Sequence, residues 1–378
     1  MKTLKQPSVA HRIARHLRLS ARAARRVPDE TPPFLVLFIN SVCNLTCEHC
    51  FYWRNLNRRD DLSFDELTAL SHDLGPIENL NLSGGEPFIR EDFDRIVRMF
   101  VRNNGVQQVY VPTSGFFPER TQAAISSVLE EKELLLFACE LSLDGTEAYH
   151  NTFRGNSNSF AKALETYDLL VEMQRSDPRL RIHAISTATH ENLGEIRALT
   201  DFLYDRCPAM DHHNLAVIRG DRKDPNLLAP PIDAYRQLSD YIRARWRDRE
   251  HGRFGAVVEP MLQWAKIRTL QEEKQVIPCR AGVITGVVYA NGDVSVCELH
   301  EPIGNLRQAT FREIWTSPQA VELRRTIANA ECWCTTEVFL WPSIVFQPKS
   351  LLRSMVAGRA WRRPRLPIVD DAPPTTES

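Results

Sequence analysis

Residues 34–50 read FLVLFINSVCNLTCEHC, and this stretch decides the fold. Residues 34–39 are apolar without interruption, which predicts a buried β-strand. Cys43, Cys47 and Cys50 follow, so they are expected on the loop at the carboxyl end of that strand. Open and barrel-shaped α/β folds place their chemistry on such loops. The stretch therefore predicts an α/β protein with a thiol-rich site at one edge of its sheet.

Three thiolates are one short of a complete ligand set for a tetrahedral metal ion or for a 4Fe–4S cube. Such a site keeps one position open, and a substrate or cofactor can bind there. A structural zinc site is the alternative, and it would need a fourth ligand such as His49. His49 directly adjoins Cys50, however, which makes it a poor partner. The spacing favours a reactive centre.

A second apolar run, Leu80–Leu82, ends in the motif Ser83-Gly84-Gly85-Glu86-Pro87. This motif and the C-x3-C-x2-C spacing before it resemble the radical S-adenosylmethionine (SAM) superfamily. In that family three cysteines hold a 4Fe–4S cluster, whose fourth iron is chelated by the amine and carboxylate of SAM. One electron cleaves SAM to a 5′-deoxyadenosyl radical, which removes a hydrogen atom from the substrate. The protein positions and shields this chemistry.

The resemblance also implies which residues contact SAM. The two glycines of the second motif allow a close backbone approach to a ligand, and that segment is expected beside the methionyl amine. Polar groups of the SLDG segment 142–145 are expected to reach the ribose or methionine. Arg154, at the end of the segment 150–154, resembles an arginine that binds the SAM carboxylate, with simple solvent exposure as the alternative. The expected SAM contacts are Gly84, Gly85, Glu86, Pro87, Ser114, Ser142, Asp144 and Arg154.

From residue 33 onward, short apolar runs alternate with amphipathic segments, which is the pattern of βαβ units. The family resemblance implies a partial (β/α)6 TIM barrel followed by a small C-terminal α+β iron–sulfur domain. We expect strands at 34–39, 79–83, 107–112, 134–142, 180–186 and 213–218, and helices near 63–74, 91–103, 118–131, 159–174 and 192–205.

Four more cysteines lie in the last part of the chain. Cys279 and Cys297, spaced C-x12-G-x4-C, resemble the opening of the SPASM/twitch extension, and Cys332 and Cys334 add two thiols. Four thiolates would complete a second, auxiliary 4Fe–4S cluster, which suits electron transfer or a structural role. A full SPASM pattern has cysteines for two clusters, so a twitch-like domain with one cluster fits better. A four-thiolate zinc site is the alternative.

The amino-acid composition indicates where the protein is located and which partners are not expected. The 378 residues include nine cysteines and carry a net charge of −1. This cysteine content favours metal ligation over disulfides in an unexported protein, and we expect a cytoplasmic location. No apolar stretch has the length of a bilayer span, and bulk charge gives no reason to expect a nucleic-acid partner. Cys139 and Cys207 have no partner at ligand spacing and are expected to pack in the core.

Both ends of the chain are basic. Val9, Ile13 and Leu17 recur every four residues among arginines, which predicts a basic amphipathic helix. The last thirty residues lack periodicity, and residues 372–378 are expected to be disordered. Peripheral contact with an anionic membrane is one interpretation of the basic ends. The favoured interpretation is that the apolar faces pack on the barrel while the arginines are solvated.

The resemblance implies an enzyme that acts on a small or amphiphilic substrate, which could be lipid-linked, with a flavodoxin- or ferredoxin-type reductant. A peptide maturase is the first alternative, although the residues before the barrel are too few for a peptide-recognition domain. A non-enzymatic metal-binding protein is the second, and no catalytic acid or base is identified. The expected domains are a basic extension at 1–32, a barrel at 33–230, a helical bridge at 231–277, an auxiliary cluster domain at 278–346 and a tail at 347–378.

Overall fold

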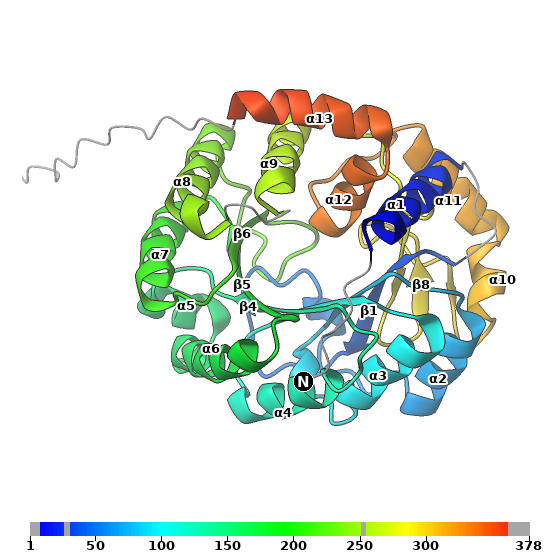
Figure 1. Ribbon diagram of the computed structural model, residues 1–378, viewed down its shortest axis with the longest axis horizontal. Coiled ribbons are helices and arrows are strands. Elements are labelled where there is room, and N and C mark those ends of the chain that lie inside the picture. Colours follow the sequence, from blue (N-terminus) through cyan, green and yellow to red (C-terminus); the bar gives the residue numbers. More distant parts are fainter. Residues whose placement is uncertain (1–7, 26–30, 251–254, 362–378) are drawn as a thin grey trace, which may run out of the picture.

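The computed structural model describes residues 8–25, 31–250 and 255–361 (Figure 1). Its centre is a sheet in the strand order β6-β5-β4-β3-β2-β1-β7-β8-β9. In Figure 1 the helices form an arc around the outside of strands β1 to β6. The helices therefore cover the outer face of the sheet, and the inner face lines a cavity.

Strands β1 to β6 are parallel and neighbour each other in chain order. All six predicted strands and all five predicted helices are present, which confirms the partial barrel. One helix, α5, was not predicted. The strands are β1 Phe34–Asn40, β2 Asn79–Gly84, β3 Gln108–Thr113, β4 Leu136–Ser142, β5 Leu180–Ala188 and β6 His212–Val217. The helices are α2 Phe64–Asp73, α3 Phe93–Asn104, α4 Pro118–Val128, α5 Glu147–Arg154, α6 Ser159–Ser176 and α7 Leu193–Arg206, with short 3-10 turns at Trp53–Asn55 and Pro87–Ile89.

Local sequence explains these elements. Every residue of β1 is buried because strands flank it on both sides. β3 and β5 instead alternate between more and less buried positions, as expected where one face meets helices and the other a cavity. Ser63 and Glu66 form the capping box that begins α2.

The C-terminal hairpin continues the sheet of the barrel. Strand β7 (Thr285–Val288) pairs in parallel with β1, and β8 (Asp293–Ser295) and β9 (Gly304–Asn305) add antiparallel strands beyond it. The predicted hairpin turn at Asn291-Gly292 is present, with Gly292 at φ +89°. Helices α10 (Phe311–Trp315) and α11 (Pro318–Ala328) follow. The hairpin therefore attaches to the barrel through backbone hydrogen bonds as well as side-chain packing.

Further helices pack beside the barrel. The predicted helical stretch at 231–275 consists of two helices, α8 (Ile232–Glu250) and α9 (Gly255–Glu272). α12 (Glu337–Val345) and α13 (Pro348–Trp361) pack with α9. The expectation that the last thirty residues lack periodic structure is wrong for α13, where Ser350 and Ser354 are buried at four-residue spacing. Small polar residues on the buried face hide this periodicity; residues 372–378 lie outside the described part of the chain.

The predicted N-terminal helix is present as α1 (Val9–Ala24), but the favoured packing is wrong. The guanidinium groups of Arg15 and Arg18 pair with Glu78, a nearly buried carboxylate. The apolar residues turn outward instead, and Val9, Ile13 and Leu17 are 71%, 55% and 63% exposed. Burial of Glu78 explains this orientation, because a buried carboxylate needs a cationic partner.

The seam between β1 and β7 gives a first prediction. A Cβ at Gly286 would lie 2.9 Å from the Trp315 ring and 2.8 Å from Pro32. We expect Gly286→Ala to destabilise the protein by about 1–3 kcal/mol through overpacking, measured by urea unfolding. Gly194→Ala is the matched control, since a Cβ there meets nothing within 4 Å. Equal stability of the two variants would contradict the packing described for this seam.

Candidate functional site

The three clustered cysteines lie where the sequence predicted, on the loop that follows β1. They line a cavity of about 500 Å³ that extends into the interior of the barrel. Six of the eight residues expected to contact SAM also line it, whereas Pro87 and Asp144 are buried behind its wall. The six are Gly84, Gly85, Glu86, Ser114, Ser142 and Arg154.

The two glycines of the second motif hold the cysteine loop in place. A Cβ on Gly84 would lie 2.2 Å from the carbonyl oxygen of Asn40, and one on Gly85 would lie 2.1 Å from that of Val42. The Gly85 N–H donates to the Asn40 carbonyl at 3.0 Å, and the Glu86 N–H donates to the Val42 carbonyl at 2.8 Å. Glycine is thus required at both positions because the two backbone segments lie in close contact, whether or not a ligand also contacts them.

The Glu86 carboxylate ties the second motif to the end of β3. One oxygen accepts from the Thr113 hydroxyl at 2.7 Å, and the other accepts from the N–H and hydroxyl of Ser114 at 2.8 and 2.6 Å. The side chain is almost fully buried. Glu86 and Ser114 therefore satisfy each other's hydrogen-bonding groups. Together they fix the ends of three neighbouring strands relative to the cysteines.

Arg154 links the SLDG segment to a cysteine. Its Nε and Nη2 donate to the same Asp144 oxygen at 2.8 and 2.5 Å, while Nη1 lies 3.9 Å from the Sγ of Cys47. Burial disfavours both charges, but the guanidinium holds the pKa of the Asp144 carboxyl below its usual range. Asp144 also accepts from the Thr187 N–H at 2.8 Å. Asp144 therefore acts through Arg154, which places a fixed positive charge beside a cysteine sulfur.

Helix α5, which sequence reasoning missed, supports the same loop. The N–H groups of Thr46 and Glu48 donate to the carbonyls of Arg154 and Phe153. The His49 ring stacks on Phe153 with centroids 4.7 Å apart. Buried His150, Phe153 and Arg154 at helical spacing before Gly155 were the available signal.

The chemistry of the three thiols fits a metal cluster. Burial, with a smaller contribution from the neighbouring Cys47, raises the pKa of Cys43 to about 12 and that of Cys50 to about 11. Buried thiols that oppose each other's ionisation lose their protons when a cation binds them. Among the described residues, no three His, Cys, Asp or Glu side chains have the spacing to hold a single metal ion.

The four remaining predicted ligands converge on a second cavity. Cys279, Cys297, Cys332 and Cys334 all line a space of about 190 Å³. Burial raises the pKa of Cys279 to about 12, with a further contribution from Cys334. Four thiols that line one small cavity are the donor set of a fully ligated cluster. Cys139 and Cys207 are both buried in the core, as expected.

The two cavities are close neighbours. Glu298 and Thr335 directly follow Cys297 and Cys334, and both line the larger cavity. The chain therefore runs directly from two cysteines of the smaller cavity to the wall of the larger one.

Family comparisons agree with this geometry. Residues 37–203 match the radical SAM superfamily, and residues 279–336 match SPASM, an iron–sulfur cluster-binding domain. The first match contains the three-cysteine loop and the second contains all four cysteines of the smaller cavity. The chain belongs to the radical SAM superfamily and carries a SPASM domain. It is an enzyme of that superfamily, and its cofactors are SAM, a 4Fe–4S cluster and additional iron–sulfur centres.

Individual relatives share the architecture at low identity. An Fe-coproporphyrin III synthase of Methanosarcina barkeri is 25% identical over 334 residues, or 82% of this chain and 80% of the relative. The subtilosin biosynthesis protein AlbA of Bacillus subtilis is 22% identical and is matched over 73% of this chain and 58% of its own length. SuiB of Streptococcus suis bound to SAM has a TM-score of 0.57 at 16% identity, covering 83% of this chain and 72% of SuiB.

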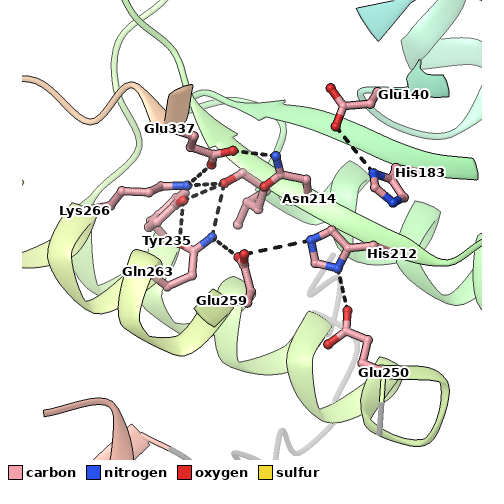
Figure 2. Close-up of polar contacts among 11 residues, drawn as sticks. Glu140, His183, His212, Asn214, Tyr235, Glu250, Glu259, Gln263, Lys266 and Glu337 are labelled. Atoms are coloured by element: carbon pink, nitrogen blue, oxygen red, sulfur yellow. Dashed lines mark hydrogen bonds and ion pairs between the residues drawn. The ribbon is translucent and has the colours of Figure 1, made fainter. Parts of the chain in front are cut away.

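The inner wall of this radical SAM barrel holds charged residues that sequence reasoning missed. Figure 2 shows Glu140, His183 and His212 on neighbouring strands, with Glu259 on α9 facing His212. All four line the larger cavity. The signal was a polar residue at alternate positions of strands that were otherwise apolar. Positions with that pattern are Gln108 and Tyr110 in β3, Glu140 and Ser142 in β4, His183 in β5, and His212 and Asn214 in β6.

His212 gives a prediction for pH dependence. Burial favours its neutral form, but Glu250, Glu259 and Glu337 outweigh burial and raise its pKa from 6.5 to about 9. The stabilising contribution of the charged ring is complete below pH 6.5 and is lost as the pH rises through about 9. We expect the free energy of unfolding to fall over that range by on the order of 3 kcal/mol more in the unmodified protein than in His212→Gln.

Urea unfolding at a series of pH values, with His212→Gln and the unmodified protein side by side, measures this difference. His72→Gln, which changes a histidine in α2 on the outside of the barrel, is the control and should keep the steep profile. Parallel profiles for His212→Gln and the unmodified protein would contradict a charged His212.

Proposed function

We propose that the larger cavity is the reaction chamber of this enzyme. Cys43, Cys47 and Cys50 hold the SAM-binding cluster at the end of the cavity that lies at the carboxyl ends of the strands. The substrate occupies the part of the cavity inside the barrel. The observation that carries this proposal is the continuity of one cavity from the three cysteines to the polar inner wall. The four cysteines of the smaller cavity hold the auxiliary cluster beside it.

The chain's own residues orient and shield the chamber. When bound, the reduced cluster and SAM supply a carbon radical that abstracts hydrogen. Arg154 directs a positive charge at the sulfur of Cys47, which stabilises the thiolate form. The close approach of Gly84 and Gly85 to the cysteine loop keeps that loop rigid. Residues of α9 and α12 line the cavity beside the sheet and limit the access of water.

The substrate that fits this chamber best is amphiphilic. Phe34 and Val36 of β1 line one part of the cavity, together with Val258 and Leu262 of α9 and Trp341 of α12. Polar residues of β2 to β6 line the same cavity, with Asn79 and Asn81 paired directly beside Phe34 and Val36. A molecule with both apolar and polar groups matches this mixed lining, since buried polar groups need partners.

A peptide is the second candidate substrate. Among solved structures of similar fold, SuiB is bound to its precursor peptide SuiA, with a TM-score of 0.55 and 16% identity. The anSMEcpe enzyme is bound to SAM and a peptide, with a TM-score of 0.58 and coverage of 88% of this chain and 97% of anSMEcpe. These likenesses support the architecture, and a single amphiphilic side chain of a peptide would satisfy the same chamber.

Cluster content and SAM cleavage test the proposal. Anaerobically reconstituted protein should hold about eight irons and form 5′-deoxyadenosine from SAM and dithionite. Changing Cys43, Cys47 and Cys50 to Ala should leave about four irons and abolish 5′-deoxyadenosine, because the open cluster loses every protein ligand. Cys207→Ala, a change in a core cysteine that lines neither cavity, should alter neither.

Two outcomes would revise the assignment. About four irons with full SAM cleavage would make the smaller cavity a zinc site. Unchanged 5′-deoxyadenosine formation in the triple variant would overturn the proposed cluster ligands.

We propose that the electrons come from a flavodoxin- or ferredoxin-type protein. To test this, purified flavodoxin and its reductase can replace dithionite in the same assay.

We also propose peripheral contact with an anionic membrane through α1. The exposed residues Val9, Ile13 and Leu17 form one stripe, and α1 contains no acidic residue. On α13, Leu352 and Val356 are exposed as well, and both helices pack on the same apolar cluster. Within the described residues, no helix is long and apolar enough to cross a bilayer. A basic helix with an exposed apolar stripe lies flat on lipid.

Vesicle flotation tests the membrane contact. The protein should float with phosphatidylglycerol-containing vesicles at low salt, and less at high salt because screening weakens the basic attraction. Ile13→Glu with Leu17→Glu should abolish flotation, because the stripe becomes acidic. Val321→Glu, which adds a charge at an exposed apolar residue of α11, is the control and should float normally. Absence of flotation by the unmodified protein would overturn the proposal.

A further inference from the structure

Three charged or ionisable residues form a continuous row across the inner wall. Glu140 is paired in register with His183, and His183 is paired with His212. Their side chains face the same cavity, and the two histidine rings lie 5.9 Å apart at their centroids. Figure 2 shows this row with Glu259 of α9 across from His212. The three residues are adjacent because their strands pair in this register, whichever rotamers their side chains adopt.

The row lies below the level of the cysteines. Glu140 precedes Ser142, the last residue of β4, by two positions. Two residues of a strand span roughly 7 Å. A substrate that reaches both levels therefore has several bonds between the group held by the row and the carbon that reacts.

The two cations near the row already have partners. Lys266 is fully buried, and its Nζ donates to Glu337 and to the Leu215 carbonyl, both at 2.5 Å. His212 Nδ1 bonds with Glu250 at 2.6 Å, and Nε2 faces Glu259 at 3.9 Å. Both oxygens of Glu337 are engaged, because Asn214 donates to the second one at 2.5 Å. Neither cation is available to bind an anionic ligand.

Glu140 is the carboxylate with the weakest partner. His183 Nδ1 lies 3.4 Å from one of its oxygens, a long contact. Its second oxygen makes no hydrogen bond within the described part of the chain. Around the row, the carboxylates of Glu250, Glu259 and Glu337 have His212, Lys266 and Arg243 as cationic neighbours, and Arg243 also pairs with Asp240. Glu140 has only the long contact with His183.

We propose that this row binds an aliphatic ammonium or guanidinium group of the substrate, with Glu140 as the ligand and Glu259 adding negative charge at the far end of the row. Such a group brings a positive charge to Glu140 and donates to its second oxygen, a charge-assisted hydrogen bond. Apolar residues of the same cavity, such as Leu262 and Trp341, accommodate the aliphatic chain that carries it. The inference rests on the proposed reaction chamber and names its substrate class: an alkylamine, or a peptide with a lysine or arginine side chain.

Binding of a minimal probe separates this inference from the chemistry. Hexylammonium has the charge and an aliphatic chain, hexanol lacks the charge, and hexanoate reverses it. Calorimetric titration of the anaerobic, cluster-loaded protein without SAM or reductant measures affinity and requires no turnover. We expect hexylammonium to bind about tenfold more tightly than hexanol, and hexanoate to bind more weakly than both.

Variants test the residue assignment. Glu140→Gln should reduce hexylammonium affinity to that for hexanol, and Glu259→Gln should reduce it less. Glu133→Gln, at an exposed glutamate just before β4, is the matched control and should bind as the unmodified protein does. Equal binding of hexylammonium and hexanol, or tighter binding of hexanoate, would overturn the inference even if Glu140→Gln failed to fold. Loss of SAM cleavage in the reconstituted protein, with probe binding intact, would instead count against the proposed function.

Discussion

The site depends on one close contact between two backbone segments. The carbonyl oxygens of Asn40 and Val42 accept from the N–H groups of Gly85 and Glu86, and no side chain fits between the segments. Strand β1 leads into the cysteine loop and β2 leads into the glycine motif. Their contact therefore sets where the sulfur atoms lie relative to the rest of the barrel. Glu86 extends the same connection to β3.

Charge inside the barrel is arranged in pairs rather than dispersed. Arg154 with Asp144, and Lys266 with Glu337, are each held by short hydrogen bonds in buried surroundings. Removal of either member would leave an uncompensated charge, which costs far more than the pair contributes. The pairs also connect distant parts of the chain, since Glu337 follows the last cysteines while Lys266 lies on α9. Catalytic geometry and folding are thus supported by the same side chains.

Much of the barrel and of the cysteine sites could be predicted from sequence, because both leave short-range patterns. Apolar runs, capping residues and cysteine spacings are local, and six strands, five helices and both thiol groups were placed correctly. The orientation of α1 was not, because it depends on Glu78, more than fifty residues away in the chain. The row of Glu140, His183 and His212 was missed for the same reason, since register between strands brings these residues together.

The pairing of β7 with β1 makes the auxiliary domain part of the barrel's own sheet. A chain cut before residue 278 would expose the edge of β1 over residues 34–37, which lie in the entirely apolar run between Phe34 and Ile39. Such a strand edge, with free N–H and carbonyl groups, is a template for pairing with other chains. The C-terminal domain therefore covers an aggregation-prone edge, and the barrel depends on it for solubility as well as for a second cluster.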